Sequence, residues 1–114
     1  SLHCPATPDT RGVVDSTFIA KLKPSAFLIN TARGVIVNEA DVAAALFDRK
    51  LAGFAADVLS VEPPSAENPL LSAPNAIITP HIAWASTESR RRLLEISAQN
   101  LKAFLDGAPQ NVVS

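Results

Sequence analysis

The sequence has little cysteine, no surplus of either charge and no long apolar run, and each shortage excludes a class of protein. Cys4 is the single cysteine, so no internal disulfide can form and no pair of thiolates can bind a metal. A reducing compartment fits this best, and we expect a cytoplasmic protein. Lys and Arg number 10 against 11 Asp and Glu, which gives no basic surface for nucleic acid. No apolar run approaches the ~20 residues of a membrane span, so we expect no membrane partner.

Methionine is absent as well, and the chain begins with SLHCP, inside a strand-like phrase. Its 114 residues are enough for one domain with one core. We therefore expect a single domain that is a piece of a longer protein. The lack of a targeting segment then says little about the whole protein.

Short apolar runs alternate with amphipathic stretches, which predicts strands alternating with helices. Short, continuously apolar strands are typical of a parallel sheet with both faces covered. The strand–helix–strand order predicts an α/β fold with right-handed crossovers. The expected strands are 26–30 (AFLIN), 53–59 (GFAADVL, with Asp57 inside it) and 76–79 (AIIT), and residues 1–3 resemble the end of a fourth.

Capping residues indicate where the helices begin. Asp15 and Asn38 can cap two short helices. A third and longer helix begins near Ser86 and ends at Gly107. The stretch 60–75 has four prolines, so we expect an irregular loop there, and loops of this length are usually functional or disordered.

Three chemically useful side chains follow the three expected strands. They are Arg33, Glu62 and His81, in that order. In open α/β sheets, ligands bind beyond the carboxyl ends of the strands, so these groups should converge there. Histidine exchanges a proton near neutral pH, a carboxylate on its second nitrogen favours the imidazolium, and arginine matches a substrate carboxylate with two bonds. This set suits reduction of a 2-oxo acid, with a nicotinamide cofactor supplying the hydride.

Each of these residues also has a purely structural explanation. A histidine at a strand end is often a satisfied structural residue, Glu62 can be a solvated loop charge, and Arg33 can lie in a surface turn. Cys4 fits a small buried hydrophobe. Asp57 is harder to dismiss, because an acid inside an apolar strand needs a partner. The convergence of several candidates favours a functional site over these separate explanations.

Several phrases together resemble the D-isomer-specific 2-hydroxyacid dehydrogenases. They are LHCPATPDTRGVV, LKPSAFLINTARGVIVNEADVAAAL, LAGFAADVLSVEP and NPLLSAPNAIITPHIAWAS, followed by the closing helix. The resemblance covers nearly the whole chain, and NTARG, D-V-x-x-x-E-P and TPHIA stand in the family's order and spacing. It implies the second half of a Rossmann-type, doubly wound parallel sheet with flanking helices. Residues 1–114 would then form the C-terminal part of an NAD(P)-binding domain.

The resemblance also implies roles for single residues. Arg33 would orient the substrate, Glu62 would pair with the catalytic histidine, and His81 would protonate the substrate carbonyl oxygen. Asp57 would hold the nicotinamide carboxamide of NAD or NADP. The full set of implied cofactor contacts is Cys4, Pro5, Thr10, Thr31, Ala32, Asp57 and Ala83. TPHIAWAS is most similar to members called glycerate dehydrogenase or hydroxypyruvate reductase, which implies a small 2-oxo acid such as hydroxypyruvate or glyoxylate as substrate.

Two parts of this family have no counterpart here. The chain has four glycines, none spaced as the G-x-G-x-x-G loop that holds a pyrophosphate, and it also lacks the family's substrate domain. We therefore expect the 114-residue piece to be inactive alone, and the longer protein to be a homodimer, as is common in the family. An alternative is an NAD-sensing module of the corepressor type, because such relatives can retain the same catalytic residues.

Overall fold

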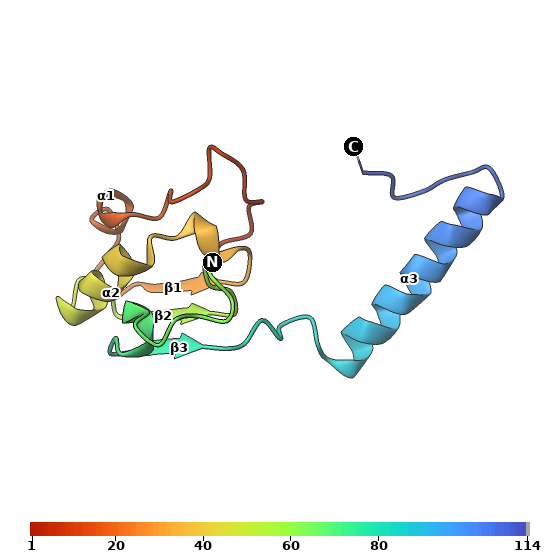
Figure 1. Cartoon of the computed structure of the whole chain (residues 1–114). Coiled ribbons are helices and arrows are strands. Elements are labelled where there is room, and N and C mark those ends of the chain that lie inside the picture. The colour runs from red at the N-terminus through yellow and green to blue at the C-terminus, as the bar shows by residue number, and fades with distance from the viewer. Residues whose placement is uncertain (114) are drawn as a thin grey trace. The chain divides into compact units, whose positions relative to one another are not determined.

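The computed structural model describes residues 1–113, which fall into two compact units, Ser1–His81 and residues 82–113. The first unit holds a small sheet with short helices, and the second holds one long helix (Figure 1). In chain order the elements are α1 (Ser16–Ile19), β1 (Phe27–Asn30), the 3₁₀ turn η1 (Gly34–Ile36), α2 (Glu39–Phe47), β2 (Gly53–Ala56), the 3₁₀ turn η2 (Pro69–Leu71), β3 (Ala76–Ile78) and α3 (Thr87–Leu105).

The three strands form one parallel sheet whose spatial order, β1-β2-β3, follows the chain. Phe27 pairs with Gly53 in the first ladder, and Phe54 pairs with Ala76 in the second. The predicted α/β fold with a parallel sheet is therefore confirmed. Because all three strands run the same way, the segments that follow them emerge at the same edge of the sheet.

The core lies between α2 and one face of this sheet. Side chains alternate along β1, so Leu28 and Asn30 are buried while Phe27 and Ile29 are exposed. The segments that connect β1 to β2 and β2 to β3 should cross over with the same hand, and in a sheet that follows chain order they then lie on the same face. In agreement, η2 of the second connection packs against α2 of the first. Helices and turns of this unit therefore cover one face of the sheet, whereas the sequence predicts cover on both faces. The core residues contributed by β2, α2 and the loops include Phe54, Ala56, Val42, Ala45, Leu46, Leu51 and Leu70.

Side-chain caps begin the helices as the sequence predicts. Asp15 and Asn38 each accept a hydrogen bond from the backbone N–H three residues on, at 2.8 Å and 3.2 Å. Ser86 does the same for α3 at 3.2 Å. Each bond satisfies one of the N–H groups that a helix start leaves unpaired. Gly107 follows the end of α3 with a φ of +74°, in the left-handed region that glycine adopts without steric cost.

Two predicted strand boundaries are wrong. β2 ends at Ala56, so Asp57 is not inside the strand but is the first residue after it. The Asp57 N–H still donates to the Asn30 oxygen at 3.0 Å, but β1 ends there and offers no further partner. The expected fourth strand is reduced to a single bridge between Leu2 and Asn30, because Pro5 soon follows and has no N–H to extend the ladder.

The proline-rich stretch 60–75 is irregular, as predicted, apart from the turn η2. The Asn68 side chain begins that turn by accepting the Leu70 N–H at 3.0 Å. Leu70 is buried in the core, whereas Leu71 is exposed. The loop is therefore attached to the core through the buried Leu70, and the partly buried Ala73 also packs against the core.

The second unit consists of α3 and its flanking residues. Leu94, Leu101 and Leu105 of α3 are exposed, and α3 contributes no buried residue to the described structure. Among residues 1–113 no helix combines the length and the apolar composition needed to cross a membrane.

Gly34 allows the loop after β1 to touch the loop after β2. A Cβ added there would lie 1.9 Å from the carbonyl carbon of Leu59 and 2.3 Å from the nitrogen of Ser60. These are backbone atoms, which cannot rotate away as a flexible side chain can. The absence of a side chain at Gly34 therefore sets the distance between the loops that carry Arg33 and Glu62.

Replacing Gly34→Ala should destabilise the first unit by about 1–3 kcal/mol, because overpacking against backbone must displace one of the two loops. The matched control is Gly53→Ala, whose Cβ would meet the exposed ring of Phe27 at 2.8 Å, a group that can turn aside, and a backbone atom, the Asn75 oxygen, only at 3.3 Å. Urea unfolding of both variants measures the difference. Equal losses for the two variants would contradict the assignment of Gly34 as a backbone contact.

Candidate active site

His81 is held just beyond β3 by a tight backbone turn. Its N–H donates to the Thr79 carbonyl at 3.0 Å, so Pro80 lies at the centre of a three-residue turn. The φ of His81 is +54°, in the left-handed region, which costs a residue with a side chain roughly 1–2 kcal/mol. Such strain persists only where the surrounding structure imposes it, and it clusters at functional sites. The backbone of His81 is thus a first sign that this histidine has more than a packing role.

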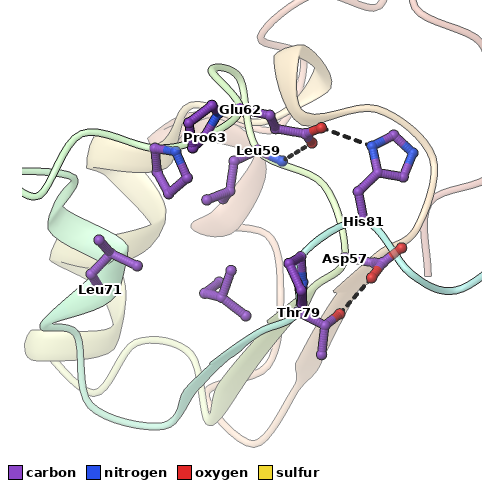
Figure 2. A pocket seen from close by; sticks show the side chains of 10 residues that line it. Asp57, Leu59, Glu62, Pro63, Leu71, Thr79 and His81 are labelled. Atoms are coloured by element: carbon purple, nitrogen blue, oxygen red, sulfur yellow. Dashed lines mark hydrogen bonds and ion pairs between the residues drawn. The ribbon is translucent and has the colours of Figure 1, made fainter.

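The His81 ring is paired with Glu62. The distance from Nδ1 to the Glu62 Oε2 is 2.7 Å, and the other carboxylate oxygen accepts the Leu59 N–H at 2.9 Å. Figure 2 shows the carboxylate between these two partners. Because Glu62 engages Nδ1, proton exchange with a small molecule must pass through Nε2. The two side chains are 45% and 38% exposed, so a ligand can reach the pair.

This pairing lowers the pKa of Glu62 from its ordinary value of 4.5. The largest cause is the hydrogen bond with His81, followed by the bond from the Leu59 N–H. Partial desolvation and the negative charge of Asp57 act in the opposite direction. Glu62 is therefore ionised at neutral pH, which is the state that can stabilise a positively charged imidazole.

Asp57 supplies a second carboxylate beside the pair. It is 7% exposed, and its Oδ1 accepts the Thr79 hydroxyl at 2.6 Å (Figure 2). Because Asp57 follows β2 and Thr79 follows β3, this bond joins the carboxyl ends of neighbouring strands. Asp57, Glu62 and His81 share a cavity of about 390 Å³ whose other walls, apart from Thr79, are apolar or proline side chains, among them Leu59, Pro63, Leu71 and Ile78.

The loop that carries Arg33 is organised by Asn30, which is completely buried at the end of β1. The Asn30 Nδ2 donates to the Arg33 carbonyl at 3.0 Å, and its Oδ1 accepts the Ala32 N–H at 3.0 Å. Both ends of the amide are thus satisfied, as a buried polar group requires. The Arg33 Nη1 donates to the Ala32 carbonyl at 2.7 Å. A buried amide therefore sets the path of the backbone from which the guanidinium extends.

Arg33 borders two cavities. One, of about 550 Å³, is lined by His3, Cys4, Pro5, Ala6, Thr31, Ala32 and Arg33. The other, of about 250 Å³, is lined by Arg33, Gly34, Val35, Val58, Leu59, Ser60, Glu62 and His81. The second cavity brings a guanidinium, a carboxylate and an imidazole to one space, as the order of the strands predicts.

The residues expected to contact a cofactor are placed unequally. Four of them line the first of these cavities: Cys4, Pro5, Thr31 and Ala32. Thr10 does not line it, and its hydroxyl instead donates to the Pro5 carbonyl at 2.7 Å, which holds the loop in place. Ala83 belongs to the second unit, so its contact stays a prediction. Within the part of the chain that the structure describes, no cluster of His, Cys, Asp and Glu could hold a metal ion.

Sequence reasoning missed two residues that shape this site, Asn30 and Glu39. Asn30 could have been identified from the sequence, because it is a polar residue at the end of an apolar strand. Glu39 binds the Ser60 N–H and the Asn68 side chain, which lie 21 and 29 positions further along the chain. No local pattern relates residues so far apart, so Glu39 could not have been found without the fold.

Comparisons with known proteins agree with this geometry. A family profile described as D-isomer specific 2-hydroxyacid dehydrogenase, NAD binding domain, matches residues 1–83. A hydroxypyruvate reductase from Blautia hydrogenotrophica is 48% identical over 114 residues, which cover 100% of this chain and 35% of that protein. A glycerate dehydrogenase from Methylorubrum extorquens is 47% identical over 115 residues, which cover 99% of this chain and 37% of that protein.

The structural comparison points the same way. The solved structure of an acyclic imino acid reductase in complex with NADPH and D-Arg matches with a TM-score of 0.90 at 30% identity, over 99% of this chain and 36% of that one. The chain thus spans only 35–37% of the length of the two relatives named above.

Replacing His81→Ala should raise the pKa of Glu62 towards 4.5, because it removes the largest cause of the lowering while the Leu59 bond remains. A carbon-13 NMR titration of the Glu62 carboxyl group measures the midpoint. Folding lowers this pKa, so the pair contributes stability that is present above 4.5 and is lost as the pH falls through the lowered value. The control Glu67→Gln, on the same loop, should leave the Glu62 midpoint unchanged. An unchanged midpoint in His81→Ala would rule out the pairing as its cause.

Proposed function

The chain belongs to the D-isomer-specific 2-hydroxyacid dehydrogenases, and on this premise we propose that it is the C-terminal part of the NAD(P)-binding domain of a longer protein that reduces a 2-oxo acid. The observation that carries the proposal is that Arg33, Glu62 and His81 line one cavity. Hydroxypyruvate or glyoxylate is the proposed substrate, because the two relatives reported above are named for hydroxypyruvate and glycerate.

In this proposal His81 is the acid that protonates the substrate carbonyl oxygen through Nε2. The Glu62 carboxylate holds the ring by Nδ1 and stabilises the imidazolium from which the proton leaves. The left-handed backbone at position 81 and the turn at Pro80 place the residue just beyond β3, where its ring meets Glu62. In the reverse direction the same nitrogen accepts the proton of the hydroxyl group.

Arg33 binds the carboxylate of the substrate and thereby orients the carbonyl group. A guanidinium has five N–H donors, and the structure records one bond, to the Ala32 carbonyl. The remaining donors can meet a carboxylate with two parallel bonds, which fixes its direction as well as its position. Both ends of a 2-oxo acid are then held from one cavity.

The described residues fit the nicotinamide end of the cofactor, which supplies the hydride when it is bound. The Asp57 carboxylate is an acceptor that suits the N–H groups of a carboxamide, and the Thr79 hydroxyl fixes its direction. Thr31 and Ala32, which are small, line the 550 Å³ cavity. We propose that the pyrophosphate is held by a glycine-rich loop elsewhere in the longer protein. The acid that separates NAD from NADP follows that loop, so the residues of this chain fit both cofactors.

We further propose that the longer protein is a cytoplasmic homodimer. The single cysteine supports a reducing compartment, because one thiol cannot form an internal disulfide. The homodimer rests on the resemblance to the family.

The proposal is tested by following NADH and NADPH oxidation by the longer protein with hydroxypyruvate, glyoxylate and pyruvate in turn. Turnover with hydroxypyruvate or glyoxylate is expected. The 114-residue chain alone should show none, because it has no glycine-rich phosphate loop. Tight cofactor binding without turnover of any of these acids would contradict the dehydrogenase function.

In the longer protein, His81→Ala should lower kcat/KM by about 10²–10⁴-fold, the usual loss when a general acid is removed. Glu62→Gln should also lower it, because the amide no longer stabilises the imidazolium. Glu67→Gln removes the same charge from the same loop and should leave the rate unchanged. Steady-state kinetics of the three variants measure these changes. A wild-type kcat/KM in His81→Ala would show that His81 is not the general acid.

A further inference from the structure

Glu39 ties the start of α2 to the loop that carries Glu62. Its Oε1 accepts the Ser60 N–H at 2.6 Å, and its Oε2 accepts the Asn68 Nδ2 at 2.6 Å. Hydrogen bonds to an ionised carboxylate are stronger than those between neutral groups. Because Ser60 and Asn68 lie on either side of Glu62, one side chain clamps both ends of the segment 60–68.

The position of Glu39 in its helix does not by itself explain these partners. It is half-buried in the first turn of α2, where a negative charge is favoured by the unpaired N–H groups of a helix start. Both recorded bonds, however, go to the distant loop and not to the N–H groups of α2. The carboxylate therefore acts between two segments rather than only on its own helix.

The first of these bonds is one step from Glu62. The Leu59 N–H binds the Glu62 carboxylate, and the following Ser60 N–H binds Glu39. The peptide group between Leu59 and Ser60 also packs directly against Gly34. The peptide group between Leu59 and Ser60 is thus held by the Glu39 carboxylate and by Gly34. The preceding N–H, that of Leu59, binds Glu62.

The second bond fixes the other end of the segment. The Asn68 Nδ2 donates to Glu39, and its Oδ1 accepts the Leu70 N–H at 3.0 Å, which begins η2. Leu70 is 1% exposed and belongs to the core. The segment 60–68 is therefore flanked by two buried core residues, Leu59 and Leu70, and is joined to α2 by Glu39.

The His81–Glu62 pair is too weak to order this loop on its own. An exposed ion pair contributes less than the conformational entropy lost when a single residue is fixed. Both members of the pair are exposed, so the order of the loop must come from other contacts. The two bonds of Glu39 and the backbone contact at Gly34 are among the contacts recorded at its two ends, together with the burial of the flanking Leu59 and Leu70.

We propose that Glu39 is a positioning residue that holds the segment 60–68 so that Glu62 meets the Nδ1 of His81. Its catalytic consequence rests on the proposed function, whereas its effect on the pair can be measured in the 114-residue chain alone.

The test exchanges the chemical groups at positions 39 and 68. Glu39→Gln leaves an amide opposite the Asn68 amide and keeps an acceptor for the Ser60 N–H. Asn68→Asp keeps the acceptor for Leu70 but places a second carboxylate against Glu39. In the double variant the new amide at position 39 can donate to the new carboxylate at position 68, which restores the bond with the net charge unchanged.

The readout is the midpoint of the Glu62 carboxyl titration by NMR, with the melting temperature measured beside it. Each single variant should move the midpoint upward toward 4.5, because a looser loop weakens the hydrogen bond from His81. The double variant should return it towards the wild-type value. The matched control is Glu67→Gln, which removes a charge from the same segment and should not move the midpoint.

Two outcomes would overturn the proposal. One is a lower melting temperature in both single variants with an unchanged Glu62 midpoint, which is the result of a merely structural role. The other is a double variant that behaves as the sum of the two single ones, without rescue. If Asn68→Asp does not fold, Glu39→Gln carries the test, since it adds no charge and keeps the Ser60 bond.

In the longer protein, Glu39→Gln should lower kcat by up to about 100-fold, the range for a misplaced catalytic group, with a smaller change in KM. The double variant should recover most of the loss. Wild-type kcat in Glu39→Gln, in a protein that does reduce 2-oxo acids, would contradict this proposal alone. Absence of all turnover would contradict the proposed function instead, and the titration would then decide the role of Glu39.

Discussion

The direct packing of Gly34 against the peptide group of Leu59 and Ser60 is the constraint on which the site depends. It leaves no space for a side chain between the loop after β1 and the loop after β2. Arg33 lies on the first loop and Glu62 on the second, so their separation follows from a contact between backbone atoms. Three parallel strands bring the loops to one edge of the sheet, and this contact then sets how far apart the functional groups lie.

The exposed groups of the site depend on polar residues that are more deeply buried. His81 and Glu62 must be accessible to react, and an accessible ion pair contributes little to stability. Asn30 is completely buried and organises the Arg33 loop, Asp57 is nearly so, and the half-buried Glu39 holds the Glu62 loop. The hydrogen bonds of Asn30 are screened from water and so retain their strength. The bond from Ser60 to Glu39 is exposed, and its strength comes from the charge of the carboxylate.

Much of the fold could be predicted because its signals are local. The caps at Asp15 and Asn38 and the three short apolar runs were read from neighbouring residues, and each appears in the structure. The predictions that were wrong concern the residues at which strands stop pairing with their neighbours. Asp57 lies outside β2 because β1 ends at Asn30, and a strand's end depends on its partner as much as on its own residues.

The sequence by itself determined the strand order along the chain, the helix starts, and which side chains follow each strand, since these depend on residues a few positions apart. It also carried the motifs that relate the chain to its family. Only the tertiary structure decided that Glu39 meets Ser60 and Asn68, and that His81 adopts a left-handed backbone. Those features depend on where α2 packs and how the loops close over the sheet, and such contacts join residues that no local pattern connects.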